Sequence, residues 1–163
     1  MKKYGRQDHL SLAIWAANCA ERELPIFEKA FPNNARPRKA IEICRTWIKT
    51  GVFRMTAIRS ASLNAHSAAR NAKENEAACM AARSAGQAVA TAHVPQHAYG
   101  AAYYALKAIV ANDPNDAAVN VDKEFNWQSN HLPENLRKKV LKRIIIQKTK
   151  KGIKIKIQKD KDF

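Results

Sequence analysis

The sequence predicts an all-α fold, a compact alanine-rich bundle of five to six helices, on three observations. Apolar residues make up 46% of the 163-residue chain, which is typical of one globular domain. They recur at helical spacing between breaks that are rich in proline and asparagine. Alanine, the strongest helix former, fills 20 of the 55 positions in 57–111, and its short side chain lets helices approach closely.

The first two predicted helices have clear boundaries. The first begins at Asp8, a good N-cap, and ends before Pro25, because the residue that precedes a proline disfavours the helical conformation. Its apolar side chains lie nearly all around the axis, so we expect this helix at the centre of the packing. The second begins at Pro37, whose missing N–H costs nothing in a first turn, and ends at Gly51.

Four further helices complete the predicted bundle. The spacing of apolar residues predicts helices over 55–72 and 76–92, with a polar break between them. The next helix, over 95–111, begins at a proline. Asp113 and Pro114 then suit the N-cap and the first position of the last helix of the bundle.

Residues 137–163 differ from the helical domain 1–136 and are interpreted as a basic C-terminal extension. A helix is predicted over 134–144. The following residues, 144–159, have a β-hairpin pattern, in which a polar turn precedes strict alternation of isoleucine and lysine. Because a two-stranded hairpin is marginal alone, its isoleucines need a surface, either the bundle or a second copy of the chain in a homodimer. A disordered tail is the alternative.

The net charge is concentrated in this extension. The chain carries 29 Lys and Arg against 14 Asp and Glu, a formal charge of +15. Residues 137–163 hold 12 basic and 2 acidic groups, a net of +10, which leaves 17 and 12, a net of +5, for the domain. Nucleic acid is therefore one predicted partner of the extension. Before Phe163 the extension has no aromatic residue that could stack on a base, so the binding expected is weak and independent of sequence. A solubilising or subunit-pairing role is the alternative.

Several function classes are excluded at this level. No apolar run approaches the ~18 residues of a membrane span, and the first residues lack a signal-peptide pattern, so we expect a cytoplasmic protein with no membrane partner. Cys19, Cys44 and Cys79 are too far apart for a disulfide framework or a zinc cluster, which favours inert buried thiols in a reducing compartment. No glycine-rich phosphate loop or nucleophile elbow is present, so no cofactor and no catalytic residue are predicted.

Three histidines form the one pattern that points to metal chemistry. His93 and His97 are four residues apart, and on an unbroken helix such a pair can share a metal ion, with His66 as a third ligand. Pro95 lies between them and weakens that geometry. We therefore favour hydrogen-bonded packing residues at crowded helix ends, with a metal-dependent enzyme as the alternative.

Two more groups of side chains are candidates for binding a partner. Tyr99, Tyr103 and Tyr104 follow His97 on the same helix, where they line a ligand pocket or fill the core. A basic group at 36–39 stands at the start of the second helix, where the helix dipole also favours an anion. Ordinary pairing with exposed glutamates is the alternative for this group.

Three stretches of the chain together resemble a known family: LAIWAANCAE and LPIFE within 12–28, RPRKAIE at 36–42, and TAHVPQHAYGAAYYALKA at 91–108. Over about residues 8–136 the chain is similar to small bacterial immunity proteins described as like the fifth immunity-protein family of polymorphic toxin systems. The isoleucine–lysine extension is not part of that pattern.

This resemblance implies an all-α cytoplasmic protein that neutralises a toxin by binding it, without chemistry of its own. Because complementary charge speeds association and this chain is basic, we expect an acidic contact surface on the toxin. The candidate partner-binding residues are Arg36, Arg38, Lys39, His93, His97, Tyr103 and Tyr104.

Overall fold

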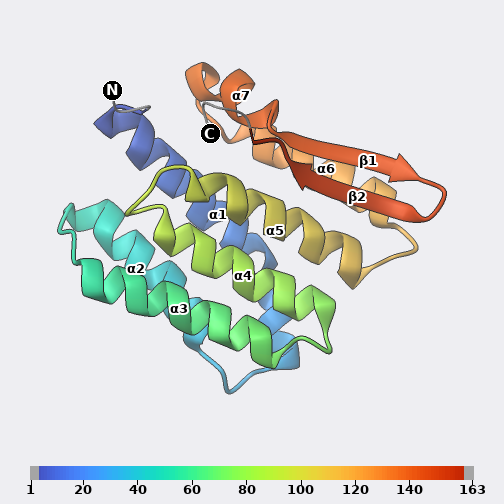
Figure 1. The fold of residues 1–163 in the computed structure, drawn as a ribbon, viewed down its shortest axis with the longest axis horizontal. Helices are drawn as coiled ribbons and strands as arrows, with labels where there is room; N and C mark the ends of the chain where they lie inside the picture. The colour runs from blue at the N-terminus through green and yellow to red at the C-terminus, as the bar shows by residue number, and fades with distance from the viewer. Residues whose placement is uncertain (1–3, 160–163) are drawn as a thin grey trace.

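The computed structural model describes residues 4–159; residues 1–3 and 160–163, the latter the end of the predicted basic extension, lie outside the described residues. The described chain forms seven helices followed by a two-stranded hairpin (Figure 1). The elements are α1 (Arg6–Ala30), α2 (Arg36–Thr50), α3 (Met55–Asn71), α4 (Glu76–Ala90), α5 (His97–Asn112), α6 (Ala117–Asn130), α7 (Glu134–Leu141), β1 (Ile144–Thr149) and β2 (Gly152–Ile157). The fold is mostly helical as predicted, with seven helices in this part of the chain instead of five to six, because α7 follows the six helices of the bundle.

Helix α1 continues through Pro25, where the sequence predicts its end. A proline inside a helix removes a backbone hydrogen bond and costs roughly 3 kcal/mol. Its neighbours Leu24 and Phe27 are fully buried, and burial of each such side chain stabilises the fold by about 1.5–3 kcal/mol. This burial offsets the proline. At the other end, Gly5 is the N-cap and Asp8 lies inside the first turn, so the predicted start is also wrong.

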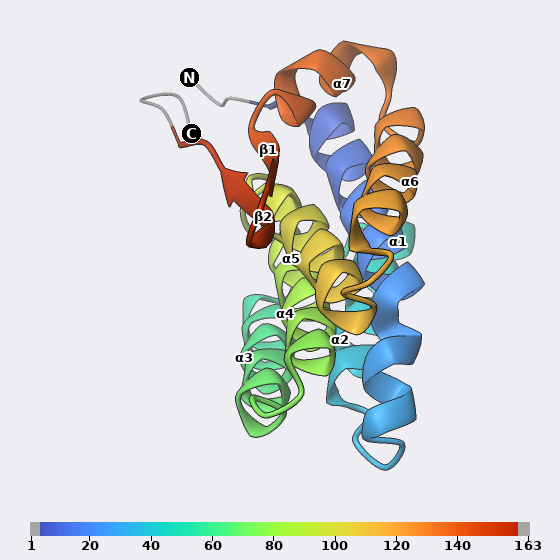
Figure 2. The same ribbon diagram turned by 90° about the vertical axis from the view of Figure 1, so that its right-hand side faces the viewer.

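The helix at the centre of the packing is α4, which contacts α1, α2, α3 and α5 and buries ten of its 15 residues, so the prediction that α1 lies there is wrong. Helix α1 packs against α2, α4 and α5 (Figure 2). Its side chains Leu12, Trp15 and Leu24 are buried. Buried alanines line α3, α4 and α5, which lets these helices lie close together. No helix among residues 4–159 is long and apolar enough to cross a bilayer.

Polar contacts attach α6 to α1. The indole N–H of Trp15 donates to the carbonyl oxygen of Gln128 at 2.9 Å. The guanidinium of Arg22 donates three hydrogen bonds of 2.8–3.1 Å to the carboxylate of Glu124, which is buried. These contacts fix the position of α6, and with it that of the connection between α5 and α6.

Two helices begin later than predicted. Helix α5 begins at His97, two residues after Pro95, because a tight turn at the end of α4 precedes it. Helix α6 begins three residues after Pro114. Here the carboxylate of Asp113 accepts a hydrogen bond from the N–H of Asp116 at 3.3 Å, which closes a turn before the helix instead of capping the helix itself.

The predicted hairpin is confirmed. Helix α7 ends at Leu141, before the predicted 144, because Ile144 pairs with Ile157 in the antiparallel β1–β2 ladder. Ile144 and Ile155 are buried in the same core as the bundle helices, whereas the lysines of β2 are exposed. Figure 2 shows the hairpin lying along α5, so its apolar face rests on the bundle of its own chain.

Candidate partner-binding site

The connection between α4 and α5 brings predicted site residues close to α3. His93 lies in that connection and His97 is the first residue of α5. Both line one cavity of about 310 Å³ with His66 of α3. Within residues 4–159, no three His, Cys, Asp or Glu side chains are grouped so that they could hold a metal ion. The three histidines therefore share a cavity without forming a ligand set.

Two glycines hold the walls of this cavity in place. A Cβ atom at Gly86 of α4 would lie 2.8 Å from His66 Nε2, so the imidazole occupies the space that a side chain would need. A Cβ at Gly100 of α5 would lie 2.6 Å from Gln87 Oε1. That oxygen accepts a hydrogen bond from His97 Nδ1 at 2.7 Å. Helix α4 thus meets α3 and α5 through side chains that lie directly on glycine backbone.

Both half-buried imidazoles are neutral at neutral pH. Burial lowers the pKa of His66, and the nearby charges of Arg83 and Arg70 lower it further. Burial also lowers the pKa of His97, and the neighbouring His93 adds to the effect. His66 Nδ1 is buried and has no hydrogen-bond partner in the described part of the chain.

A second cavity, of about 600 Å³, adjoins the first across Gln87 and His97, which line both. Its wall includes Tyr103 and Tyr104, whose rings meet edge to face with centroids 4.9 Å apart. Lys107 lies 5.4 Å from the centroid of the Tyr103 ring. The structure therefore brings four of the seven predicted partner-binding residues, including both tyrosines, to one side of the bundle.

Exposed apolar side chains border the histidine cavity. Among residues 4–159 six large apolar side chains are exposed, and four of them belong to the α2–α3 loop and α3: Val52 (56%), Phe53 (44%), Met55 (42%) and Leu63 (56%). Met55 and Leu63 line the cavity, and Phe53 stacks on His93 with ring centroids 6.3 Å apart. We call these four residues, with His93 and the cavity beside them, the histidine surface.

Sequence reasoning missed the four apolar residues. The available signal was that Val52 and Phe53 lie just after the C-cap Gly51, outside any helix whose buried face could cover them.

The surroundings of the histidine surface are basic. The sequence contains no Asp or Glu between Glu42 and Glu74, and none between Glu76 and Asp113. Helices α3 and α5, and α4 after its first residue, therefore carry arginine and lysine without acidic neighbours on the same helix. A surface that is both apolar and cationic complements an acidic partner.

The predicted basic group at the start of α2 lies apart from the histidine surface. Helix α2 has 15 residues, so its start is about 22 Å from the α2–α3 loop. Arg38 donates hydrogen bonds of 2.7 and 2.9 Å to the carboxylate of Glu28, and Arg36 donates one of 3.2 Å to Ser67. These arginines attach α2 to α1 and α3. Lys39 lines a shallow cavity beside the α1–α2 connection.

The three cysteines are buried, as predicted for inert thiols. Burial raises the pKa of Cys19, and it raises the pKa of Cys44 to about 12. The Cys44 thiol donates to the carbonyl oxygen of Ala88 at 3.3 Å. Both thiols are therefore protonated at neutral pH and are poor nucleophiles.

A helical scaffold with an exposed apolar and cationic patch defines a protein suited to binding another protein. The chain belongs to the family described as Imm-5 like putative immunity protein, whose sequence model matches residues 2–135. This match confirms the resemblance seen in the sequence, and the hairpin lies outside it. Neither the curated proteins nor the solved structures contain a match to the chain.

Proposed function

We propose that this chain is an immunity protein that neutralises a protein toxin by binding it and covering its functional surface, without catalysis. The observation that carries the proposal is the histidine surface, where the α2–α3 loop and α3 carry four of the six exposed large apolar side chains of residues 4–159, two of which, Met55 and Leu63, line the cavity. Single exposed apolar residues are ordinary, but a contiguous patch marks a contact site. Membership of the immunity-protein family supports a toxin as the partner.

In the proposed complex, one side chain of the toxin enters the histidine cavity. Its volume of about 310 Å³ suits a single large residue. Phe53, Met55 and Leu63 lose their exposure to water on docking, which contributes about 25 cal/mol for each Å² of apolar area removed from solvent.

The charge around the cavity selects the rest of the partner surface. Arg59 lines the cavity itself, and Arg83 lies over the ring of Tyr104, 6.0 Å from its centroid. We therefore propose acidic residues around the toxin's anchoring side chain, with His97, Tyr103 and Tyr104 extending the contact. Arg36, Arg38 and Lys39 are a proposed second contact. The free, buried thiols support a reducing, cytoplasmic setting for the complex.

Co-expression of the chain with the products of the genes that flank its own gene, tested one at a time for toxicity, tests this proposal. The tagged protein is expected to capture the toxin, and cells that produce both are expected to survive. The double variant Phe53→Ser/Leu63→Ser is expected to lose capture and protection. The matched control is Ile14→Ser/Val119→Ser, which changes two exposed apolar residues outside the histidine surface and should retain both properties. Failure of the wild-type chain to capture the toxin and to protect cells would overturn the proposal.

A further inference from the structure

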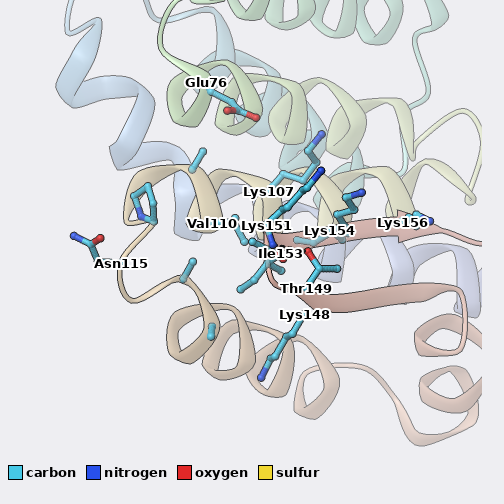
Figure 3. Close-up of a pocket in the computed structure, with 16 residues that line it drawn as sticks. Glu76, Lys107, Val110, Asn115, Lys148, Thr149, Lys151, Ile153, Lys154 and Lys156 are labelled. Carbon is cyan, nitrogen blue, oxygen red and sulfur yellow. Dashed lines mark hydrogen bonds between the residues drawn. The ribbon is translucent and has the colours of Figure 1, made fainter.

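A cationic groove lies between the hairpin, the end of α5 and the α5–α6 connection (Figure 3). Its volume is about 770 Å³, and Glu76 is the one acidic side chain that lines it. Val110 and Ile153 contribute to an apolar floor. The lysines that line it are Lys107, Lys148, Lys151, Lys154 and Lys156. We call this site the lysine groove.

The hairpin register aligns two of these lysines. Lys154 and Lys156 lie two residues apart on one strand, opposite Gln147 and Ile145, so they share a face and are about 6.6 Å apart along β2. The isoleucines of β2 lie on the other face and are buried or half-buried against the bundle. The alternation therefore exposes a row of cations in one fixed direction.

Most of these charges have no internal counterion. Lys148 forms an ion pair with Asp122 of α6. Within residues 4–159, Lys151, Lys154 and Lys156 form no ion pair with a carboxylate. Like charges gathered around one groove repel one another, and a bound polyanion removes that repulsion.

The row of lysines leads to the two tyrosines of α5. Ile157 and Lys159, at the end of β2, line the same 600 Å³ cavity as Tyr103 and Tyr104. The sequence alone predicts no aromatic partner for the basic extension, because both tyrosines lie some 40 to 50 residues earlier in the chain. The fold places the aromatic rings of α5 beside the lysines of the extension, which has no aromatic residue of its own before Phe163.

We propose that the lysine groove and the adjoining tyrosine cavity bind single-stranded nucleic acid. Lys151, Lys154 and Lys156 contact successive phosphates, and Tyr103 or Tyr104 contacts a base. A cationic track next to aromatic side chains is the usual arrangement for a single strand whose bases are unpaired. The lysines of this site are separate from the proposed toxin contact, because the lysine groove lies at the other end of α5 from the histidine surface. The two tyrosines belong to the cavity that adjoins the histidine cavity and are shared with that contact.

The arrangement favours nucleic acid over a lipid surface or an acidic polypeptide. Membrane binding needs apolar side chains beside the cations, but the isoleucines of β2 face the bundle. An acidic polypeptide has no flat ring system for the tyrosines to contact. Both alternatives are outcomes of the test.

Fluorescence anisotropy of the full-length protein tests the proposal. The probes are labelled 20-nucleotide oligodeoxythymidine and oligouridine, with a duplex of equal length, unlabelled polyglutamate and anionic lipid vesicles as competitors. The double variant Lys154→Gln/Lys156→Gln is expected to raise Kd at least about tenfold in 50 mM NaCl. It should also reduce the slope of log Kd against log salt by about 1.4, because each phosphate contact with a single strand contributes about 0.7.

A charge-matched control and an aromatic variant complete the experiment. Lys29→Gln/Lys49→Gln removes two exposed cations from α1 and α2 and should leave the slope unchanged. Tyr103→Leu/Tyr104→Leu should weaken single-strand binding at least about fivefold without changing duplex binding or the slope. The proposal is overturned if the lysine variant binds as the wild type does, if the duplex binds as tightly as the single strand, or if polyglutamate or vesicles compete as well as unlabelled oligonucleotide.

Discussion

The histidine surface and the lysine groove lie at opposite ends of α5, a helix of 16 residues and about 24 Å, and they expose opposite chemistry. The histidine surface exposes apolar side chains beside neutral imidazoles. The lysine groove buries its isoleucines and exposes its cations. Both regions are basic by residue count, so net charge does not distinguish them. The two regions differ in the direction in which their apolar side chains face. This difference predicts that salt weakens binding at the groove far more than at the histidine surface.

The largest expected effect separates the two surfaces directly. Phe53→Ser/Leu63→Ser should lower toxin affinity by about 100-fold, because hot-spot residues at the centre of an interface carry most of its binding energy. The same variant should bind oligodeoxythymidine with unchanged Kd. Titration calorimetry with the toxin and anisotropy with the oligonucleotide measure the two values. An equal loss at both sites would show that the two surfaces are not independent.

The next largest effect is a loss of stability at Gly86, which packs against the His66 ring. Gly86→Ala should lower the free energy of unfolding by about 1–3 kcal/mol, because the new Cβ would overlap the His66 ring. Adding His66→Ala should recover part of the loss, since it removes the overlapping ring. Urea unfolding measures both variants. Gly5→Ala is the control for steric overlap, because a Cβ there meets nothing within 4 Å, and its loss should stay below about 1 kcal/mol, the cost of a weaker N-cap for α1. A loss in the control as large as that in Gly86→Ala would contradict the explanation.

A buried carboxyl group away from both surfaces gives a third, smaller effect. Burial raises the pKa of Glu23 to about 8, the nearby Glu124 adds to the rise, and Arg22 opposes it. The folded state therefore keeps a proton that the unfolded chain loses near 4.5, so stability falls as pH rises from about 4.5 to about 8.

Glu23→Gln removes this dependence. We expect it to raise the free energy of unfolding on the order of 1 kcal/mol at pH 8 and to give no gain at pH 4. Urea unfolding at the two pH values checks this, and the affinities at both surfaces should not change. Equal effects at pH 4 and pH 8 would mean that the titration of Glu23 is not the cause.

The smallest effect concerns the two half-buried imidazoles. Because burial lowers the pKa values of His66 and His97, the unfolded chain takes up protons first as the pH falls below about 6.5, and stability decreases with them. His66→Gln should reduce this loss between pH 6.5 and pH 5. Thermal unfolding across that range measures it. His131→Gln, which alters an exposed ring, is the control. A variant as acid-sensitive as the wild type would argue against His66.

Local patterns were enough to predict much of the fold. Alternation in 153–157 predicted the hairpin and its apolar face, and Gly51 was correctly placed at the end of α2. The errors arose where distant contacts outweigh local preference. Pro25 lies inside α1 because its neighbours are buried by other helices, and α6 begins late because Asp113 bonds to the turn that precedes it.

The candidate site was predictable only where its residues are neighbours in the chain. His93, His97, Tyr103 and Tyr104 follow one another on the α4–α5 segment, so the sequence could group them. The stacking of Phe53 on His93 joins positions 40 residues apart and depends on how the α2–α3 loop packs. The binding functions assigned to these residues stay predictions until the variants are measured.

Helix α4 meets α3 and α5 through side chains that rest on Gly86 and Gly100, so the His66 ring and the Gln87 amide are already held in place before any partner arrives. A partner that docks there loses little affinity to the freezing of rotamers, which otherwise costs about 0.5–1.5 kcal/mol for each immobilised side chain. Differences in affinity between related complexes arise mainly from differences in their dissociation rates. Gly86 and Gly100 therefore lengthen the lifetime of the proposed complex. For an inhibitor, this lifetime sets how long each captured molecule stays inactive.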